Sequence, residues 1–143
     1  MDNKLVFTEK EKEEFKSLAH TLRNTQNYAL TKDDEICVFR HLRYAIENNK
    51  IQRDLFGLNP IILSLQTAII AIEEIGLKRD GTIAVLLYPC VSQNETSEID
   101  SSIDKFGDNV KRILRGLVHI QELYKKNPVI ESENFRNLLL SFA

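Results

Sequence analysis

The stretch NPIILSLQTAIIAIEEIG, residues 59–76, decides the fold of this chain. Asn59 is a strong helix N-cap, and Pro60 suits the first helical position, where no backbone N–H is needed. A long apolar run follows, and Gly76 supplies the left-handed residue that commonly ends a helix. Residues 55–72 carry no charge, yet they include several polar side chains, which a membrane span rarely tolerates. The stretch therefore predicts a helix of a soluble domain.

Two amphipathic helices are predicted before this stretch. Thr8 and Glu11 have the spacing of a capping box, and apolar residues then recur at helical intervals over residues 15–22. Thr31 predicts the start of a second helix, whose apolar stripe fades at Asn48 and Asn49. Both helices have one apolar face, as expected for elements that cover a core.

The segments after residue 76 are less uniform. Residues 80–88 fit a buried strand or a buried helix, and the lack of a partner strand favours helix, which Pro89 is expected to end or kink. Ser97 is expected to cap a short helix closed by Gly107, and residues 110–124 carry the longest apolar stripe. Six or seven helices and no convincing strand pair predict an all-α fold, a compact multi-helix bundle forming one domain over residues 1–143.

Composition restricts the class of protein further. The chain has 143 residues, with 19 Lys+Arg against 21 Asp+Glu and a net charge of −2, which disfavours a dedicated nucleic-acid module. Two cysteines, Cys37 and Cys90, are too few for a disulfide framework or a four-thiolate zinc site. No export signal follows Met1. We therefore expect a cytoplasmic protein without a membrane partner.

Candidate chemistry is sparse. At 100° per residue, His20 and His119 are expected to face solvent, and His41 is expected at the edge of an apolar face as a partly buried structural residue. The glutamates over residues 9–14 alternate with lysines and are expected to be solvated. A basic face on the last long helix could meet RNA phosphates, but solvation is the simpler interpretation of its members, Lys111, Arg112, Arg115, His119 and Lys126.

A family resemblance covers about the second half of the chain. Residues 75–87, 106–118 and 133–140 are similar, in order and spacing, to the N-terminal HD-type domain of the RelA/SpoT family, and Asn59-Pro60 extends the similarity upstream. These enzymes make and destroy the alarmones ppGpp and pppGpp. The resemblance implies an HD-domain-like helical bundle. Residues 1–50 resemble no specific family.

The resemblance also locates the family's hydrolase site, where metal-binding histidines and an aspartate stand in active members. Asn59 occupies the first histidine position, Tyr88-Pro89 occupies the His-Asp position, and Ser92-Gln93 occupies the position of the catalytic acidic pair. The family's last aspartate would lie beyond Ala143. A protonated tyrosine and a proline cannot replace histidine and aspartate at a divalent ion. No metal site and no catalytic residue are therefore predicted, and hydrolysis is expected to be absent.

The resemblance implies a role for a longer protein. Residues 138–143 form an uncapped apolar end, so we expect an N-terminal fragment of a longer chain. The resemblance implies that the longer chain is a GTP pyrophosphokinase, which transfers pyrophosphate from ATP to GTP or GDP. The implied magnesium-dependent synthetase domain would follow in cis, with the ribosome as partner in the stringent response. The silent domain would then bias the synthetase.

Two alternatives stay open at this point. The chain could be an active phosphohydrolase in which His41 or His119 rescues the metal, or a stand-alone helical interaction module complete at Ala143. Nucleotide binding is unassigned, because Lys50 and Arg53 lie near Asn59 but do not match the family's spacing of guanine-binding residues.

Overall fold

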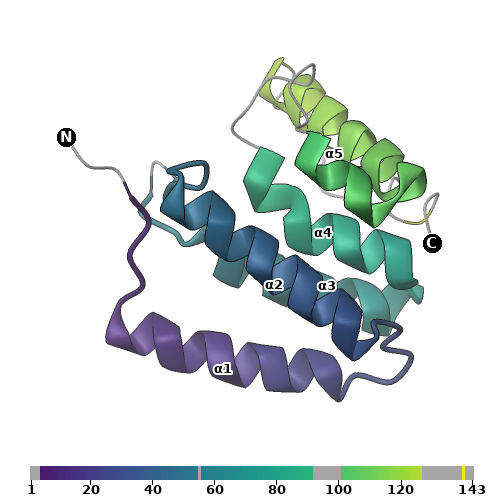
Figure 1. Cartoon of the computed structure of the whole chain (residues 1–143), viewed down its shortest axis with the longest axis horizontal. Helices are drawn as coiled ribbons and strands as arrows, with labels where there is room; N and C mark the ends of the chain where they lie inside the picture. The colour runs from purple at the N-terminus through teal and green to yellow at the C-terminus, as the bar shows by residue number, and fades with distance from the viewer. Residues whose placement is uncertain (1–3, 55, 92–100, 127–139, 141–143) are drawn as a thin grey trace.

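The computed structural model describes residues 4–54, 56–91, 101–126 and 140. These residues form α-helices and one short 3₁₀ helix, with no strand among them, which confirms the all-α prediction. The helices are α1 (Glu9–Arg23), α2 (Lys32–Glu47), α3 (Pro60–Ile75), α4 (Arg79–Val91), the 3₁₀ helix η2 (Ser101–Phe106) and α5 (Asp108–Lys126). They stack from α1 on one side to α5 on the other, with α4 between α5 and the pair α2 and α3 (Figure 1).

The first three helices begin where local sequence signals place them, and α2 and α3 also end at their predicted positions. The Thr8–Glu11 capping box is present at α1, and Thr31 forms a second capping box with Asp34 at α2. The Asn59 side chain caps α3, and Gly76 ends it with a left-handed φ of 66°. The structure confirms these predicted caps, and each of them depends only on residues within one helical turn.

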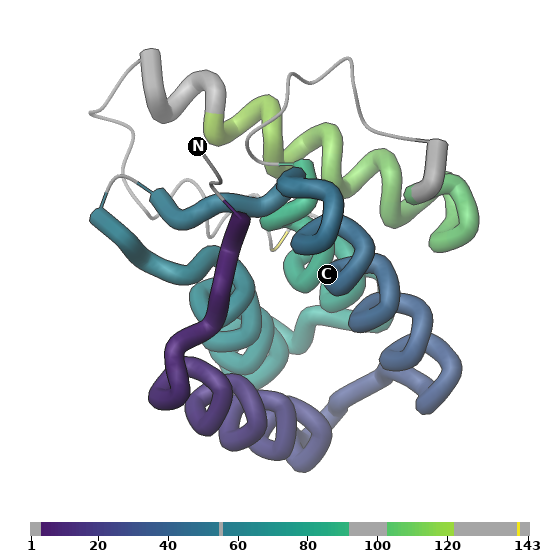
Figure 2. Tube along the Cα trace, turned by 60° about the vertical axis from the view of Figure 1, so that its left-hand side comes forward, coloured from purple at the N-terminus to yellow at the C-terminus, as the bar shows by residue number. Residues whose placement is uncertain are grey.

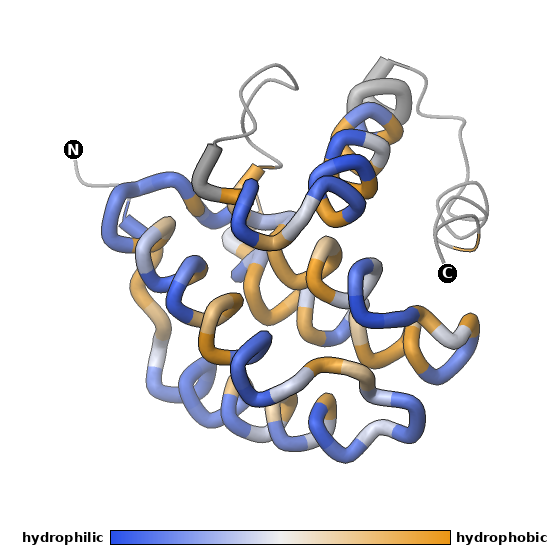
Figure 3. Tube along the Cα trace, turned by 45° about the vertical axis from the view of Figure 1, so that its right-hand side comes forward, coloured by the Kyte–Doolittle hydropathy of each residue, from blue (hydrophilic) through white to orange (hydrophobic). Residues whose placement is uncertain are grey.

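Helix α4 is buried along nearly its whole length. Ten of its thirteen residues are buried, and α2, α3 and α5 all pack against it. Gly81 permits close packing, since a Cβ there would lie 2.5 Å from Leu77 Cδ1. Figure 3 shows the apolar residues concentrated on the central helices, whereas the outer α1 is mainly hydrophilic.

Sequence left two outcomes for Pro89, an end or a kink of the helix, and the structure excludes the first, because α4 does not end at Pro89. The proline lies in the last turn and the helix continues to Val91. Pro89 has no N–H to offer the carbonyl of Val85, so one backbone hydrogen bond is lost. The burial of Cys90 and Val91 beyond the proline keeps the last turn in place.

The segment before α5 is only partly described. Ser97 and Ile99 fall in residues 92–100, outside the described part, so the predicted cap cannot be placed. Within η2, Ile103 and Phe106 are buried three residues apart, which matches the three-residue period of a 3₁₀ helix. Gly107 follows with a φ of 101°, and α5 begins at the next residue. Gly107 therefore separates the two helices as predicted.

Helix α3 carries one buried and one exposed isoleucine, which allow a matched test of how much the core contributes to stability. Ile72 is 1% exposed and Ile70 is 54% exposed on the same helix. We expect Ile72→Ala to lower the free energy of unfolding by about 2–5 kcal/mol, because it leaves a cavity, and Ile70→Ala to change it by about 0.5 kcal/mol. Urea denaturation followed by circular dichroism measures both, and equal losses would contradict the packing described.

Candidate functional site

A small pocket lies where the start of α3 meets the end of α4 and the middle of α5. Its volume is about 190 Å³. We call it the Tyr88 pocket, and it is lined by Pro60, Leu63, Ser64, Thr67, Val85, Tyr88, Pro89 and Leu117. Its walls are almost entirely apolar, so it offers little for binding a charged group.

The start of α3 and the end of α4 come together at this pocket, although Asn59 itself is not among its lining residues. Pro60 lines one side, and Tyr88 and Pro89 line the other, although 28 residues separate the two groups in sequence. Asn59 precedes Pro60 and is 4% exposed. Ser92 and Gln93 lie outside the described residues.

Asn59 acts as a helix cap. Its Oδ1 accepts hydrogen bonds from the backbone N–H of Ile61 at 3.0 Å and of Ile62 at 3.4 Å. Its Nδ2 is buried and makes no hydrogen bond within the described part of the chain. The side chain thus turns its acceptor toward the helix and leaves only a donor, which cannot bind a cation.

Tyr88 is bound into the core. Its hydroxyl donates a hydrogen bond to Gln121 Oε1 at 2.5 Å. Burial raises the pKa of the Tyr88 hydroxyl above its ordinary value, so the phenol stays protonated at neutral pH. A manganese ion requires several deprotonated or neutral N and O donors in fixed geometry. The donor set of Asn59, Tyr88 and Pro89 does not fit such an ion.

None of the three histidines lines the Tyr88 pocket. His20 and His119 are exposed, as expected from sequence. His41 is more deeply buried than expected, at 5% exposure, because its ring packs edge to face on Phe106 with 5.8 Å between centroids. Within the described ranges, no three His, Cys, Asp or Glu side chains are grouped as a metal site would require.

The basic residues of α5 whose side chains are described lie mostly on the solvent-exposed face, as predicted. Arg112, Arg115 and His119 are exposed, and Lys111 is partly buried and paired with Asp104. The side chain of Lys126 lies outside the described part. Arg112 also donates to Asn109 Oδ1 at 2.8 Å, so part of this face is engaged in local contacts. This arrangement is typical of a solvated helix face.

An ion pair that the sequence did not predict holds the segment before Asn59. Arg53 donates to the Glu11 carboxylate from both terminal nitrogens, at 2.8 Å and 2.5 Å, and also to the carbonyls of Val6 and Gly57. Glu11 was expected to be solvated, but its side chain is only 17% exposed. The two residues are 42 positions apart, so helical spacing alone gave no signal for this contact. Figure 2 shows the N-terminal segment running beside the loop between α2 and α3.

The same contacts give the basic residues before Asn59 structural roles. All the hydrogen bonds of the Arg53 guanidinium described above go to protein oxygen atoms. The Lys50 ammonium lies 5.2 Å from the centroid of the Tyr44 ring. Neither residue lines the Tyr88 pocket. A nucleotide-binding role is therefore not assigned to them.

Comparisons with known proteins add no relative to these observations. No protein-family model, no curated protein and no solved structure matches the chain. No helix in the described ranges is both long enough and apolar enough to span a membrane.

The Glu11–Arg53 pair predicts a distinct pH dependence of stability. The Arg53 hydrogen bond lowers the pKa of Glu11 from 4.5 to about 2 in the folded chain. Its stabilisation is therefore complete above pH 4.5 and is lost as the pH falls toward 2, where the folded carboxylate gains a proton. We expect Glu11→Gln to lower the free energy of unfolding by about 1.5–3 kcal/mol at pH 7 and to shrink the acid loss between these limits.

Chemical denaturation from pH 7 to pH 2 measures this effect. Glu13→Gln is the matched control, because Glu13 is exposed on the same helix and its substitution removes the same charge. A Glu11→Gln profile parallel to that of the unsubstituted chain would show that the pair does not carry the stability assigned to it.

Proposed function

We propose that this chain is the catalytically silent HD-type domain of a GTP pyrophosphokinase of the RelA/SpoT kind. One observation supports this most directly: Pro60, which follows the ligand position Asn59, lines the same pocket as Tyr88 and Pro89, which occupy the His-Asp position. The packing of α3 on α4 brings these positions together although they are 28 residues apart in sequence.

The chemistry of the pocket supports the silent form of the domain. Alarmone hydrolysis in the family uses a metal ion to lower the pKa of water and a carboxylate to accept its proton. Asn59 directs its oxygen into α3, and Tyr88 uses its hydroxyl to bind Gln121. Neither residue supplies a ligand or a base, so the pocket wall functions as packing.

The surface beside the pocket suggests what the domain does instead. Leu63 lines the pocket and is 40% exposed, and Ile70, two turns further along α3, is 54% exposed. We infer that this α3 face packs against the synthetase domain in cis and biases its equilibrium between active and inactive states. The synthetase would bind ATP, GTP or GDP and magnesium, and the full protein would act in the cytoplasm at the ribosome.

Restoring the family's ligands tests the resemblance directly. The triple variant Asn59→His, Tyr88→His, Pro89→Asp supplies three ligands, two imidazoles and one carboxylate, which divalent ions bind. We expect saturable one-to-one Mn²⁺ binding by the triple variant and none by the unsubstituted chain, measured by electron paramagnetic resonance of free Mn²⁺. Asn59→His alone is the control, because it supplies a single new ligand.

The same samples test hydrolysis. Incubation of the unsubstituted chain with ppGpp and Mn²⁺ should release no pyrophosphate, as followed by ion-exchange chromatography. Release of pyrophosphate would overturn the silent assignment and favour an active phosphohydrolase with other ligands. A folded triple variant without Mn²⁺ binding would instead remove the support that the shared pocket gives to the resemblance.

The regulatory role has its own test in the full-length pyrophosphokinase. Leu63→Asp with Ile70→Asp places two charges on the exposed α3 face, and a change of at least about threefold in ppGpp synthesis with or without ribosomes is expected. Ser17→Asp with Lys16→Asp, exposed on α1, is the control pair. Unchanged synthesis in the α3 variant, or a gene that encodes no synthetase domain, would favour a stand-alone interaction module.

A further inference from the structure

A second and larger cavity lies between α1 and α2, on residues that the proposed function does not use. Its volume is about 540 Å³, within the range typical of small-molecule sites. We call it the α1–α2 groove. Its apolar lining consists of Phe7, Phe15, Phe39, Leu42, Ile46 and Ile61, none of which lines the Tyr88 pocket.

Aromatic rings build the walls of this groove. Phe15 of α1 meets Phe39 of α2 edge to face, with 5.7 Å between ring centroids, and Phe7 meets Phe15 in the same way at 5.9 Å. All three rings are only partly buried, although they pack on the core. Edge-to-face packing holds the rings in fixed orientations, so their remaining apolar surface is available to a ligand.

One end of the groove is crossed by the N-terminal segment. Lys4 and Phe7 contribute to the lining, and the adjoining Val6 carbonyl accepts a hydrogen bond from Arg53 at 2.8 Å. Figures 1 and 2 both show this segment passing from the start of α1 toward the loop after α2. A groove closed at one end suits a small ligand better than a helix of a partner protein, because a long helix needs a groove that is open at both ends.

Charges line the groove with a clear positive excess. The charged residues that line it are Lys4, Arg23, Arg43 and Glu47. Arg23 donates to Glu35 at 3.2 Å through Nε alone. Arg43 is exposed and forms no ion pair with any residue in the described ranges. A guanidinium beside an apolar cavity is suited to bind a carboxylate whose chain enters the cavity.

We propose that the α1–α2 groove binds a medium-chain carboxylate, with the aliphatic chain among the phenylalanine rings and the carboxylate on the Arg43 guanidinium. The apolar lining provides the driving force, and the positive rim selects the anionic head group. This site is independent of the proposed function, since either could be correct without the other.

Binding of sodium decanoate tests the proposal, with decanol and decyltrimethylammonium as probes of equal chain length. Isothermal titration calorimetry below the micelle concentration gives affinity, and backbone amide NMR shifts locate the site. We expect saturable decanoate binding with shifts at the groove, and at least about tenfold weaker binding of the other two probes. Octanoate should bind about fifteenfold more weakly, since each buried CH₂ contributes about fourfold.

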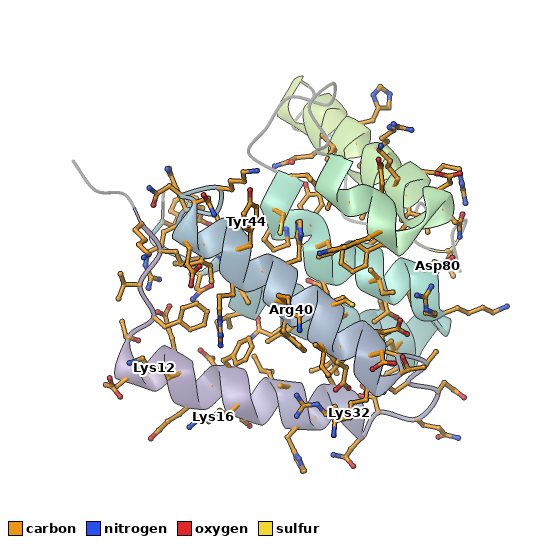
Figure 4. The ribbon with its side chains drawn as sticks, in the orientation of Figure 1. Lys12, Lys16, Lys32, Arg40, Tyr44 and Asp80 are labelled. Carbon is orange, nitrogen blue, oxygen red and sulfur yellow. The ribbon has the colours of Figure 1, made fainter. Side chains whose placement is uncertain are left out.

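Two arginines on α2 provide the matched variants. Arg43→Glu should weaken decanoate binding by at least about tenfold, because it reverses the charge that contacts the carboxylate. Arg40 does not line the groove and lies on the front of α2 (Figure 4), so Arg40→Glu should change affinity by less than about twofold. Ile46→Trp should fill the groove and abolish binding. If that variant does not fold, the comparison of Arg43→Glu with Arg40→Glu still tests the proposal.

Three results would overturn the proposal. Equal affinity for decanol and decanoate would show an apolar cavity without anion selection. Equal effects of Arg40→Glu and Arg43→Glu would show that only net charge matters. Absence of decanoate binding together with binding of an acidic amphipathic peptide would show that the groove accepts a partner helix.

Discussion

The burial of α4 on all sides is the constraint on which the rest of the structure depends. A helix with ten of its thirteen residues buried has no face to offer to water, so it must be enclosed by other elements. Helices α2, α3 and α5 supply that enclosure, and α1 closes the bundle by packing on α3. Each outer helix then needs only one apolar face. This explains why the sequence alternates between amphipathic segments and two nearly uniform apolar ones, residues 60–72 and 81–91.

The same constraint determines what the end of α4 can carry. Position 88 faces the interior between α3 and α5, where an ionisable group without a bound metal or partner would lose its hydration. Tyrosine meets this requirement, because its ring is apolar and its hydroxyl reaches Gln121. Pro89 is tolerated in the last turn because Cys90 and Val91 are buried beyond it.

Local signals and distant contacts were not equally predictable from the sequence. The caps at Thr8, Thr31 and Asn59 were predicted correctly, since each hydrogen bond joins residues two or three positions apart. The pattern of residues 80–88 fitted a helix or a strand, because a fully buried helix loses the periodicity that distinguishes the two. The lack of a partner strand favoured helix, and α4 confirms that prediction. The deep burial of His41 and the pairing of Glu11 with Arg53 were missed, because Phe106 and Arg53 are far away in sequence. The groove was missed for the same reason: the N-terminal segment, α1, α2 and α3 all contribute to it.

The first turn of α3 connects the two surfaces to which we assign roles. Pro60 lines the Tyr88 pocket and Ile61 lines the α1–α2 groove, so consecutive residues face different cavities. Asn59 caps this turn through its Oδ1, which accepts a hydrogen bond from the backbone N–H of Ile61. The turn is therefore fixed by the cap and lies beside the Glu11–Arg53 pair, which joins α1 to the loop before α3. Any energetic coupling between ligand binding in the groove and packing on the α3 face would have this turn as its shortest physical path, and such coupling acts equally in both directions.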